Sequence, residues 1–375
     1  DLSGSDLTGT ILRGVDLTGA NLTDATLIGS DLTGTILKGS NLTGANLTGL
    51  DLSGRDLSDT ILRGMDLTDK DLTGTILRGA DLTGANLTGL DLSVTDLTYA
   101  NLSGQDLSDH DLTNVILTGA DLSNSVLPDN GLSGKNFDYT IFNGVDLSGK
   151  DLSGSTFQFA SFDNTNLENA NLSDTNFLEV DFTVIKNKSL AGTDLSINSF
   201  AHSNLSGVNL SGAIMEANNF RAANLSDLDF TVISNASIIR SVYQGANLSN
   251  ANFEDVNLYD NGIYRIVFPG KAMWADKSNL ELTDILNTHL INRWITEKQV
   301  VGNDLVADFI FFNNFASANL QNVNFSNVNL SNALFLNADL TNANLTGANL
   351  NAAELDGAIL SNANLKCKNH TICDG

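Results

Sequence analysis

The chain has 375 residues, of which 19 are basic and 44 acidic, giving a net charge of -25. This acidity argues against binding to nucleic acid or to an anionic membrane, and favours protein or cationic partners. No apolar run approaches the roughly 18 residues of a membrane-spanning helix, so we expect no membrane insertion.

A large apolar residue recurs at every fifth position from Leu2 to Phe182, thirty-seven times in succession. We call each such Leu or Phe a centre. A helix repeats its apolar face every 3.6 residues or so and a strand every second residue, so a period of five requires a backbone that turns once per unit. The residue two after the centre is most often Gly, and otherwise frequently Asp or Asn. These three residues tolerate the positive φ that the third position of a type II turn requires.

A second, longer repeat fixes the number of units per coil. Residues 31–54 recur almost unchanged at 71–94, a period of forty. Forty residues make two coils of four units, whereas three units per coil would not divide forty evenly. The centre and the small residue two positions before it then point inward. We expect a filled lumen with no room for a substrate.

A unit such as Ala20-Asn21-Leu22-Thr23-Asp24 resembles the pentapeptide-repeat family, whose units follow the pattern A(D/N)LXX. The resemblance covers most of the chain. It implies an all-β solenoid, a right-handed quadrilateral β-helix with four units per coil.

The phase of the repeat divides the chain into five regions. They are regular coils at 1–182, coils with two phase breaks at 183–268, an insertion at 269–304, C-terminal coils at 305–366 and a tail at 367–375. The two breaks are steps of eight residues, from Phe182 to Leu190 and from Phe230 to Ile238, and each begins with Asp-Phe-Thr-Val-Ile. Two copies of one sequence favour a specified bulge or corner loop.

The insertion has the periodicity of an amphipathic helix. Ser278 and Glu281 have the spacing of a capping box, and apolar residues follow at helical intervals through Trp294. We therefore expect one α-helix over 279–298, inserted into the solenoid. Both tryptophans, Trp274 and Trp294, lie in the insertion. The helix either packs on one side of a coil or presents the tryptophans to a protein partner or to a second copy of the chain.

Cys367 and Cys373 are the two cysteines of the chain, and both lie in its last nine residues. We predict that they form a disulfide that closes the last coil. A disulfide implies an oxidising compartment, so we expect an extracellular or cell-surface location. Two unrelated thiols in a cytoplasmic protein are the alternative.

Residues twenty apart lie on the same side of successive coils, and one side carries a ladder of carboxylates. Its members are Asp31, Asp51, Asp71, Asp91 and Asp111. Stacked carboxylates repel each other, and calcium bound between adjacent coils would offset the repulsion. These aspartates are therefore the candidate metal ligands, and no other cofactor is expected. The alternative is a solvated ladder, or one neutralised by Lys70 and Lys150, that only makes this side soluble.

No catalytic constellation is visible in the sequence, because the four histidines are scattered and no phosphate-binding or nucleophile motif is present. We expect a non-enzymatic structural or interaction solenoid, with calcium as a stabiliser if the ladder binds it. The family resemblance implies a second function. Some members mimic DNA and bind type II topoisomerases through negative charge along the coil axis. The acidity agrees with that alternative, whereas the cysteine pair does not.

Overall fold

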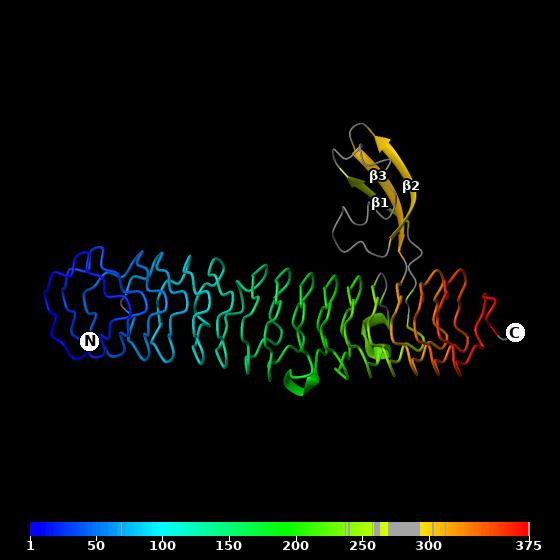
Figure 1. Ribbon diagram of the computed structural model, residues 1–375, viewed down its shortest axis with the longest axis horizontal. Helices are drawn as coiled ribbons and strands as arrows, with labels where there is room; N and C mark the ends of the chain where they lie inside the picture. The colour runs from blue at the N-terminus through cyan, green and yellow to red at the C-terminus, as the bar shows by residue number, and fades with distance from the viewer. Residues whose placement is uncertain are drawn as a thin grey trace. The chain divides into compact units, whose positions relative to one another are not determined.

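The computed structural model describes residues 1–68, 70–236, 238, 241–256, 258, 263–268, 293–301, 304–311 and 313–373. The chain divides into two compact units. Unit 1 is Asp1–Val180 with Val184–Asn187, and unit 2 is Asp181–Thr183 with Lys188–Gly375. Each unit contains a stack of coils (Figure 1).

Each coil of unit 1 has twenty residues, because single parallel bridges join positions twenty apart, as between Asn21 and Asn41. The carbonyl of a centre accepts a hydrogen bond from the N–H three residues later, as Leu2 does from Ser5 at 3.1 Å. Gly4, the third residue of this turn, has a φ of 65°. A positive φ at that position is the mark of a type II turn, so the predicted corner is confirmed.

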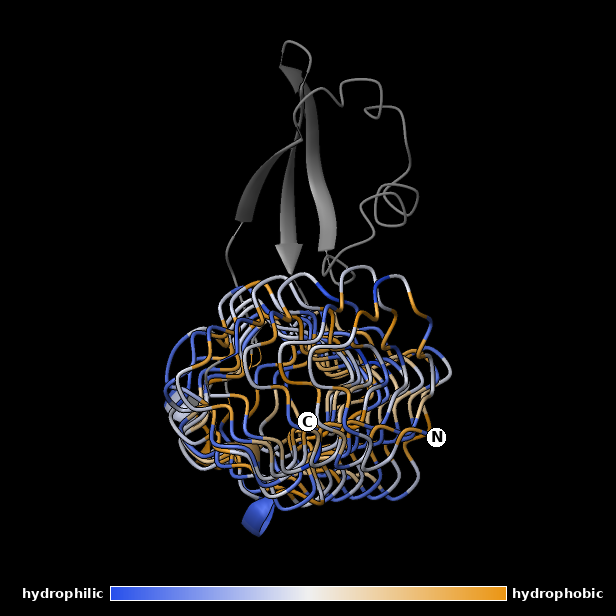
Figure 2. Ribbon diagram, turned by 90° about the vertical axis from the view of Figure 1, so that its left-hand side faces the viewer, coloured by the Kyte–Doolittle hydropathy of each residue, from blue (hydrophilic) through white to orange (hydrophobic). Residues whose placement is uncertain are grey.

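The centres fill the lumen of each unit, and nearly all of them are fully buried. Aromatic centres stack from coil to coil, with ring centroids 5.3 Å apart for Phe137 and Phe157 and 5.1 Å apart for Phe157 and Phe177. Hydrophilic and hydrophobic positions alternate along each side of the coils (Figure 2). The core is a continuous column of side chains, as the sequence predicts.

We call each pair of neighbouring coils on one side a step, and not every step of unit 1 has a bridge. The size of the inward residue, two positions before the centre, determines which steps are bridged. On the side that runs from Asn21 to Ser161, the inward residues are Ala, Ser or Thr, and every step is bridged. On the other sides, a bridge to the preceding coil is missing wherever the later coil has an inward residue larger than Ala, Ser or Thr. Val115 is the exception among the described residues of unit 1. These larger residues are Leu50, Arg55, Met65, Lys70, Leu90, Gln105, His110, Asn130, Lys135, Val145 and Lys150. A small side chain lets neighbouring backbones approach to about 4.8 Å, whereas a larger one occupies the gap.

The two eight-residue steps are corner loops that contain short 3-10 turns. These turns are η1 (Lys186–Lys188), η2 (Phe230–Val232) and η3 (Ser234–Ala236). Bridges join Asp181 to Asn204 and Asn219 to Val242, so each coil with a loop has three residues more than twenty. The predicted phase breaks are therefore specified loops.

The insertion contains an antiparallel sheet. Its strands β1 (Ile263–Phe268), β2 (Arg293–Val301) and β3 (Asp304–Phe311) lie in the order β1-β3-β2. The predicted helix over 279–298 is wrong for residues 293–298, which belong to β2, and its remainder lies outside the described residues. Ile295, Thr296 and Val300 are β-branched and favour a strand, which the helical spacing up to Trp294 does not reveal.

The strands also move two predicted boundaries. β1 lies within 183–268, where coils were expected, and β3 contains Leu305, where the sequence places the return of the array. Coils resume instead at Asn314, which bridges Val242. Leu305 has the right spacing for a centre, but pairing of β3 with strands on both sides overrides that spacing.

Candidate functional site

The five predicted aspartates lie on one side of unit 1, which we call the aspartate side (centres Leu12, Leu32, Leu52, Leu72, Leu92, Leu112, Leu132 and Leu152). Each carboxylate is tied to its own turn. In each of the five, Oδ1 accepts a hydrogen bond from the N–H two residues later, at 2.8–2.9 Å. In Asp31 and Asp51, Oδ1 also accepts the hydroxyl of that same residue, at 2.6 and 2.7 Å.

These hydrogen bonds favour the ionised carboxylate. The hydroxyl and N–H of Thr33, followed by the Arg13 guanidinium 2.8 Å away, lower the pKa of Asp31 to about 2. The hydroxyl and N–H of Ser53 lower the pKa of Asp51 in the same way. The turn hydrogen bonds of Asp31 and Asp51 therefore favour the ionised form of these two carboxylates.

The aspartates do not fit a calcium site. Within the described residues, no group of three or more His, Cys, Asp or Glu side chains is arranged to hold a metal. Calcium takes six to eight oxygen ligands or thereabouts. Each coil offers one outward aspartate on this side, and one of its oxygens is already committed to a turn. The sequence pattern could not show this commitment, because Asp twenty residues apart looks the same whether its oxygens are free or used.

The aspartate side is only partly joined between coils, since the Gly54 N–H donates to the Thr73 carbonyl at 3.0 Å and the Gly134 N–H donates to the Ser153 carbonyl at 2.8 Å. It has no bridge at any step from Asp31 to Asp151, because the inward residues along it are large. His110 is buried with its Nδ1 3.1 Å from the Leu90 carbonyl, and the Lys150 ammonium donates to Asp129 at 2.8 Å. The predicted pairing of Lys70 and Lys150 with the ladder is thus not formed, since Asp129 lies outside it.

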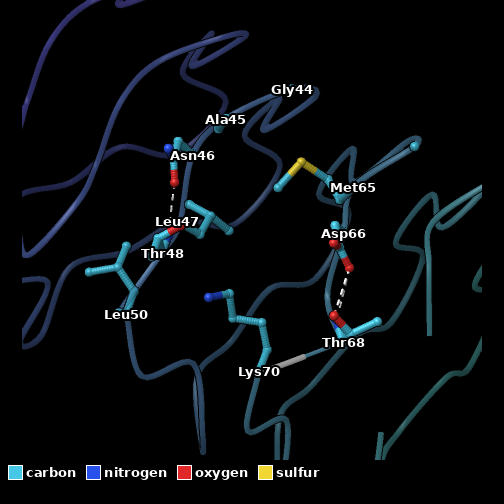
Figure 3. Close-up of a pocket in the computed structure, with 12 residues that line it drawn as sticks. Gly44, Ala45, Asn46, Leu47, Thr48, Leu50, Met65, Asp66, Thr68 and Lys70 are labelled. Atoms are coloured by element: carbon cyan, nitrogen blue, oxygen red, sulfur yellow. Dashed lines mark hydrogen bonds between the residues drawn. The ribbon is translucent and has the colours of Figure 1, made fainter. Parts of the chain in front are cut away.

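A cleft lies between two coils beside this opening. It has a volume of about 610 Å³ and is lined by residues within 44–50 and 64–70. Figure 3 shows Lys70 reaching into the cleft between Leu50 and Asp66. The Lys70 ammonium helps to lower the pKa of Asp66, after the N–H and hydroxyl of Thr68. Met65 and Lys70 occupy inward positions and hold the two coils apart.

Two cations at inward positions, the buried Lys135 and the half-buried Arg55, were missed by the sequence analysis. Lys135 is 8% exposed, and its ammonium donates to the carbonyls of Thr113 and Val115, both at 3.1 Å. Burial lowers the pKa of Lys135. The Arg55 guanidinium donates to the Leu32 carbonyl at 2.7 Å. Both cations bond to carbonyls beside unbridged steps. The signal was a charged residue at the position that the repeat reserves for Ala, Ser or Thr.

The other predicted site residues have different outcomes. Cys367 and Cys373 form the predicted disulfide, with Cα atoms 5.0 Å apart. Trp294 lies in β2, where it pairs with Ile310 of β3. Trp274 lies outside the described residues. Partner binding by the two tryptophans therefore stays a prediction.

A family model described as pentapeptide repeats matches eight segments of the chain. They are residues 1–39, 27–64, 66–98, 91–128, 151–183, 199–231, 314–351 and 333–366, which together cover more than half of the chain. The chain belongs to the pentapeptide-repeat family. Members fold as right-handed β-helices and are typically non-enzymatic structural or interaction proteins, and no catalytic family is indicated.

Solved structures similar to this pentapeptide-repeat protein include three of the same kind. A trypsin-treated form of QnrB1, a plasmid-mediated fluoroquinolone resistance protein, is 19% identical, with 51% of this chain and 89% of that chain covered and a TM-score of 0.21. HetL, from the cyanobacterium Nostoc sp. strain PCC 7120 and involved in heterocyst differentiation regulation, is 23% identical, with 96% and 88% covered and a TM-score of 0.14. A protein of the Arabidopsis thaliana thylakoid lumen is 23% identical, with 33% and 69% covered and a TM-score of 0.12.

These low identities and TM-scores carry no argument about the function of this chain. A search of curated proteins finds no match. In the parts of the chain that the structure describes, no helix has both the length and the apolar character needed to cross a bilayer.

Proposed function

We propose that this pentapeptide-repeat protein is a non-enzymatic scaffold that binds another protein through its outer sides. The observation that carries the proposal is the filled lumen: the centres are buried in a continuous column, so the variable residues all face outward or into shallow clefts. Among the described residues, His110, His202 and His370 belong to separate repeats or to the tail. A protein-binding role requires only the outer sides of the coils, which remain exposed when the lumen is filled.

Retention of a partner tests the scaffold function. The tagged full chain is exposed to extract from its own source at near-physiological salt, beside an unrelated acidic β-solenoid as control. We expect one protein retained in stoichiometric amount by this chain alone. Equal retention by both proteins, or none by either, contradicts the proposal.

We further propose an extracellular or cell-surface location, supported by the Cys367–Cys373 disulfide. Alkylating intact cells with a thiol reagent before lysis tests it. Cysteines that resist alkylation until a reductant is added support an oxidising compartment. Direct alkylation of both cysteines favours the cytoplasmic alternative.

A second candidate is an acidic DNA mimic that binds a type II topoisomerase, and the net charge of -25 favours it. The turn hydrogen bonds of Asp31 and Asp51 favour the ionised carboxylates that a mimic of phosphates requires. A DNA supercoiling assay with gyrase tests this candidate. Inhibition at micromolar protein supports it, and unchanged supercoiling removes it.

A further inference from the structure

The exposed apolar residues of unit 1 gather on one side, which we call the isoleucine side (centres Leu17, Leu37, Leu57, Leu77, Leu97, Leu117, Phe137 and Phe157). More than half of the large exposed apolar residues of unit 1 lie there. One is Val15, at the inward position of the Leu17 unit, and the others are Ile36, Ile76, Ile116, Tyr99, Tyr139 and Phe159. The rest are spread over the remaining sides and a corner loop. Such a concentration on an acidic protein marks an interaction surface.

The three isoleucines form a regular strip. Each immediately precedes a centre, and they are 48%, 38% and 49% exposed in chain order. They recur every forty residues, which places them on every second coil, with Asp56 and Asp96 between them. Stacked Phe rings on neighbouring coils are 5.1–5.3 Å apart, so two coils span about 10 Å. The strip therefore repeats an apolar contact every 10 Å or so.

This spacing matches an α-helix. Seven helical residues rise about 10.5 Å, and seven residues are also close to two full turns, so every seventh residue faces the same way. A helix lying along the coil axis can place one apolar residue against each isoleucine over about three heptads. A β-strand has no comparable coincidence, because its same-face residues recur every 6.8 Å or so.

An aromatic ridge runs beside the strip. The Tyr99 ring covers Gly119 on the next coil, where an added Cβ would lie 2.2 Å from the ring. Tyr139 and Phe159 stack with ring centroids 5.1 Å apart. Between ridge and strip lies a hollow of about 450 Å³, and its lining includes Ile76 and Tyr99. Ile76 of the strip and Tyr99 of the ridge thus line one shallow groove, together with Lys38 and Arg78.

The charges beside the groove specify the partner further. Lys38 and Arg78 are more than half exposed, and each is 3.8 Å from its nearest carboxylate, on Asp59 and Asp96. Arg13, on the aspartate side, holds its partner carboxylate at 2.8 Å instead. Loosely paired, exposed cations are available to acidic residues of a partner.

We propose that the isoleucine side of unit 1 is a docking groove for an amphipathic α-helix with a large apolar residue at every seventh position and glutamates on the flank that meets Lys38 and Arg78. The inference rests on the proposed scaffold function and names its partner class. Binding uses apolar burial along the strip, with charge setting the orientation of the helix.

The test uses the full chain and a synthetic 22-residue peptide with Leu at every seventh position, Glu on one flank and Ala elsewhere. A second peptide of the same composition has Leu at every sixth position. Fluorescence anisotropy is expected to give at least tenfold tighter binding to the first peptide. Ile76→Asp is expected to weaken that binding at least tenfold. Val126→Asp is the matched control, because Val126 is 54% exposed at the same position of its repeat on another side.

Equal affinity for the two peptides, or equal loss with Ile76→Asp and Val126→Asp, overturns the inference. Sedimentation of the parent chain checks for a second copy as occupant, and a dimer that Ile76→Asp dissociates also overturns it. The retention experiment separates the two proposals. A partner retained equally by the parent and by Ile76→Asp contradicts the groove but leaves the scaffold function intact, whereas no partner at all removes both.

Discussion

The rule that inward residues control the bridges between coils gives a specific prediction for Lys70. Lys70 is a large inward residue on the aspartate side, and the step from Asp51 to Asp71 has no bridge. Its ammonium has no hydrogen-bond or ion-pair partner among the described residues, so its removal breaks no contact of that kind. We predict that Lys70→Ala closes the step and narrows the cleft that Figure 3 shows.

The expected magnitude follows from the bridged steps. At such a step Asn41 donates to the Ala20 carbonyl at 2.9 Å, and Leu22 donates to the Asn41 carbonyl at 2.8 Å. The equivalent bonds in the variant join Asp71 N–H to the Leu50 carbonyl, and Leu52 N–H to the Asp71 carbonyl. Two bonds at about 0.5–1.5 kcal/mol each are expected to slow amide exchange by about 5- to 150-fold.

Hydrogen exchange resolved to single amides measures the effect at Leu52 and Asp71. A large inward residue on the preceding coil does not prevent closure, since the step from Asp66 to Asn86 is bridged although Met65 precedes it. Lys38→Ala is the matched control, because Lys38 is exposed and outward. Unchanged exchange at both amides in Lys70→Ala, or equal slowing in the control, would refute the rule.

Further predictions follow from single contacts. Thr95 is fully buried with no partner for its hydroxyl, whereas the Thr75 hydroxyl donates to the Leu52 carbonyl at 3.0 Å. We therefore expect Thr95→Val to raise the free energy of unfolding by about 1 kcal/mol and Thr75→Val to lower it by about 1–3 kcal/mol. Urea unfolding followed by far-UV circular dichroism measures both, and changes of the same sign would contradict this expectation. Carboxylates whose folded pKa is depressed contribute stability above the unfolded pKa near 4, and lose it as pH falls through the folded pKa, which is about 2 for Asp31. Melting temperature should accordingly fall between about pH 4 and pH 2. EDTA or added Ca²⁺ should leave the melting temperature unchanged, and a rise with Ca²⁺ would restore the calcium hypothesis. Cys367→Ser should destabilise the last coil by about 2 kcal/mol, from the entropy of its short loop, seen as faster exchange there and not in unit 1.

The sequence predicted the coil because its determinants are local and repeated. The period of five, the residue with positive φ and the forty-residue echo each appear many times, so a chance departure at one unit changes nothing. In the insertion, by contrast, each pattern that indicates a helix or a strand occurs only once. Helical spacing up to Trp294 therefore favoured a helix while the β-branched residues just beyond it favoured a strand, and no second copy of the segment was present to decide between them.

The candidate site was less predictable for a different reason. The large inward residues Leu50, Lys70 and His110 were visible in the sequence, but their effect depends on how closely two backbones approach. That distance is a property of neighbouring coils and not of one repeat. The aspartate ladder was located correctly, whereas the use of its oxygens in turns required the coordinates.

The pattern of bridges also bears on which side suits a periodic partner. Ile76 lies between bridged steps to Asp56 and Asp96, and the step from Asp96 to Ile116 is bridged as well. Backbone hydrogen bonds therefore fix the spacing of these two isoleucines, as a helix with its own fixed rise requires. Ile36 is separated from them by the unbridged step onto the coil of Arg55. The Gly39 N–H donates to the Ser58 carbonyl at 2.8 Å across this step, but the two hydrogen bonds of a bridge are missing, so the coil spacing there changes at lower cost. We therefore expect Ile36→Asp to weaken helix binding less than Ile76→Asp, although Ile36 is the more exposed of the two.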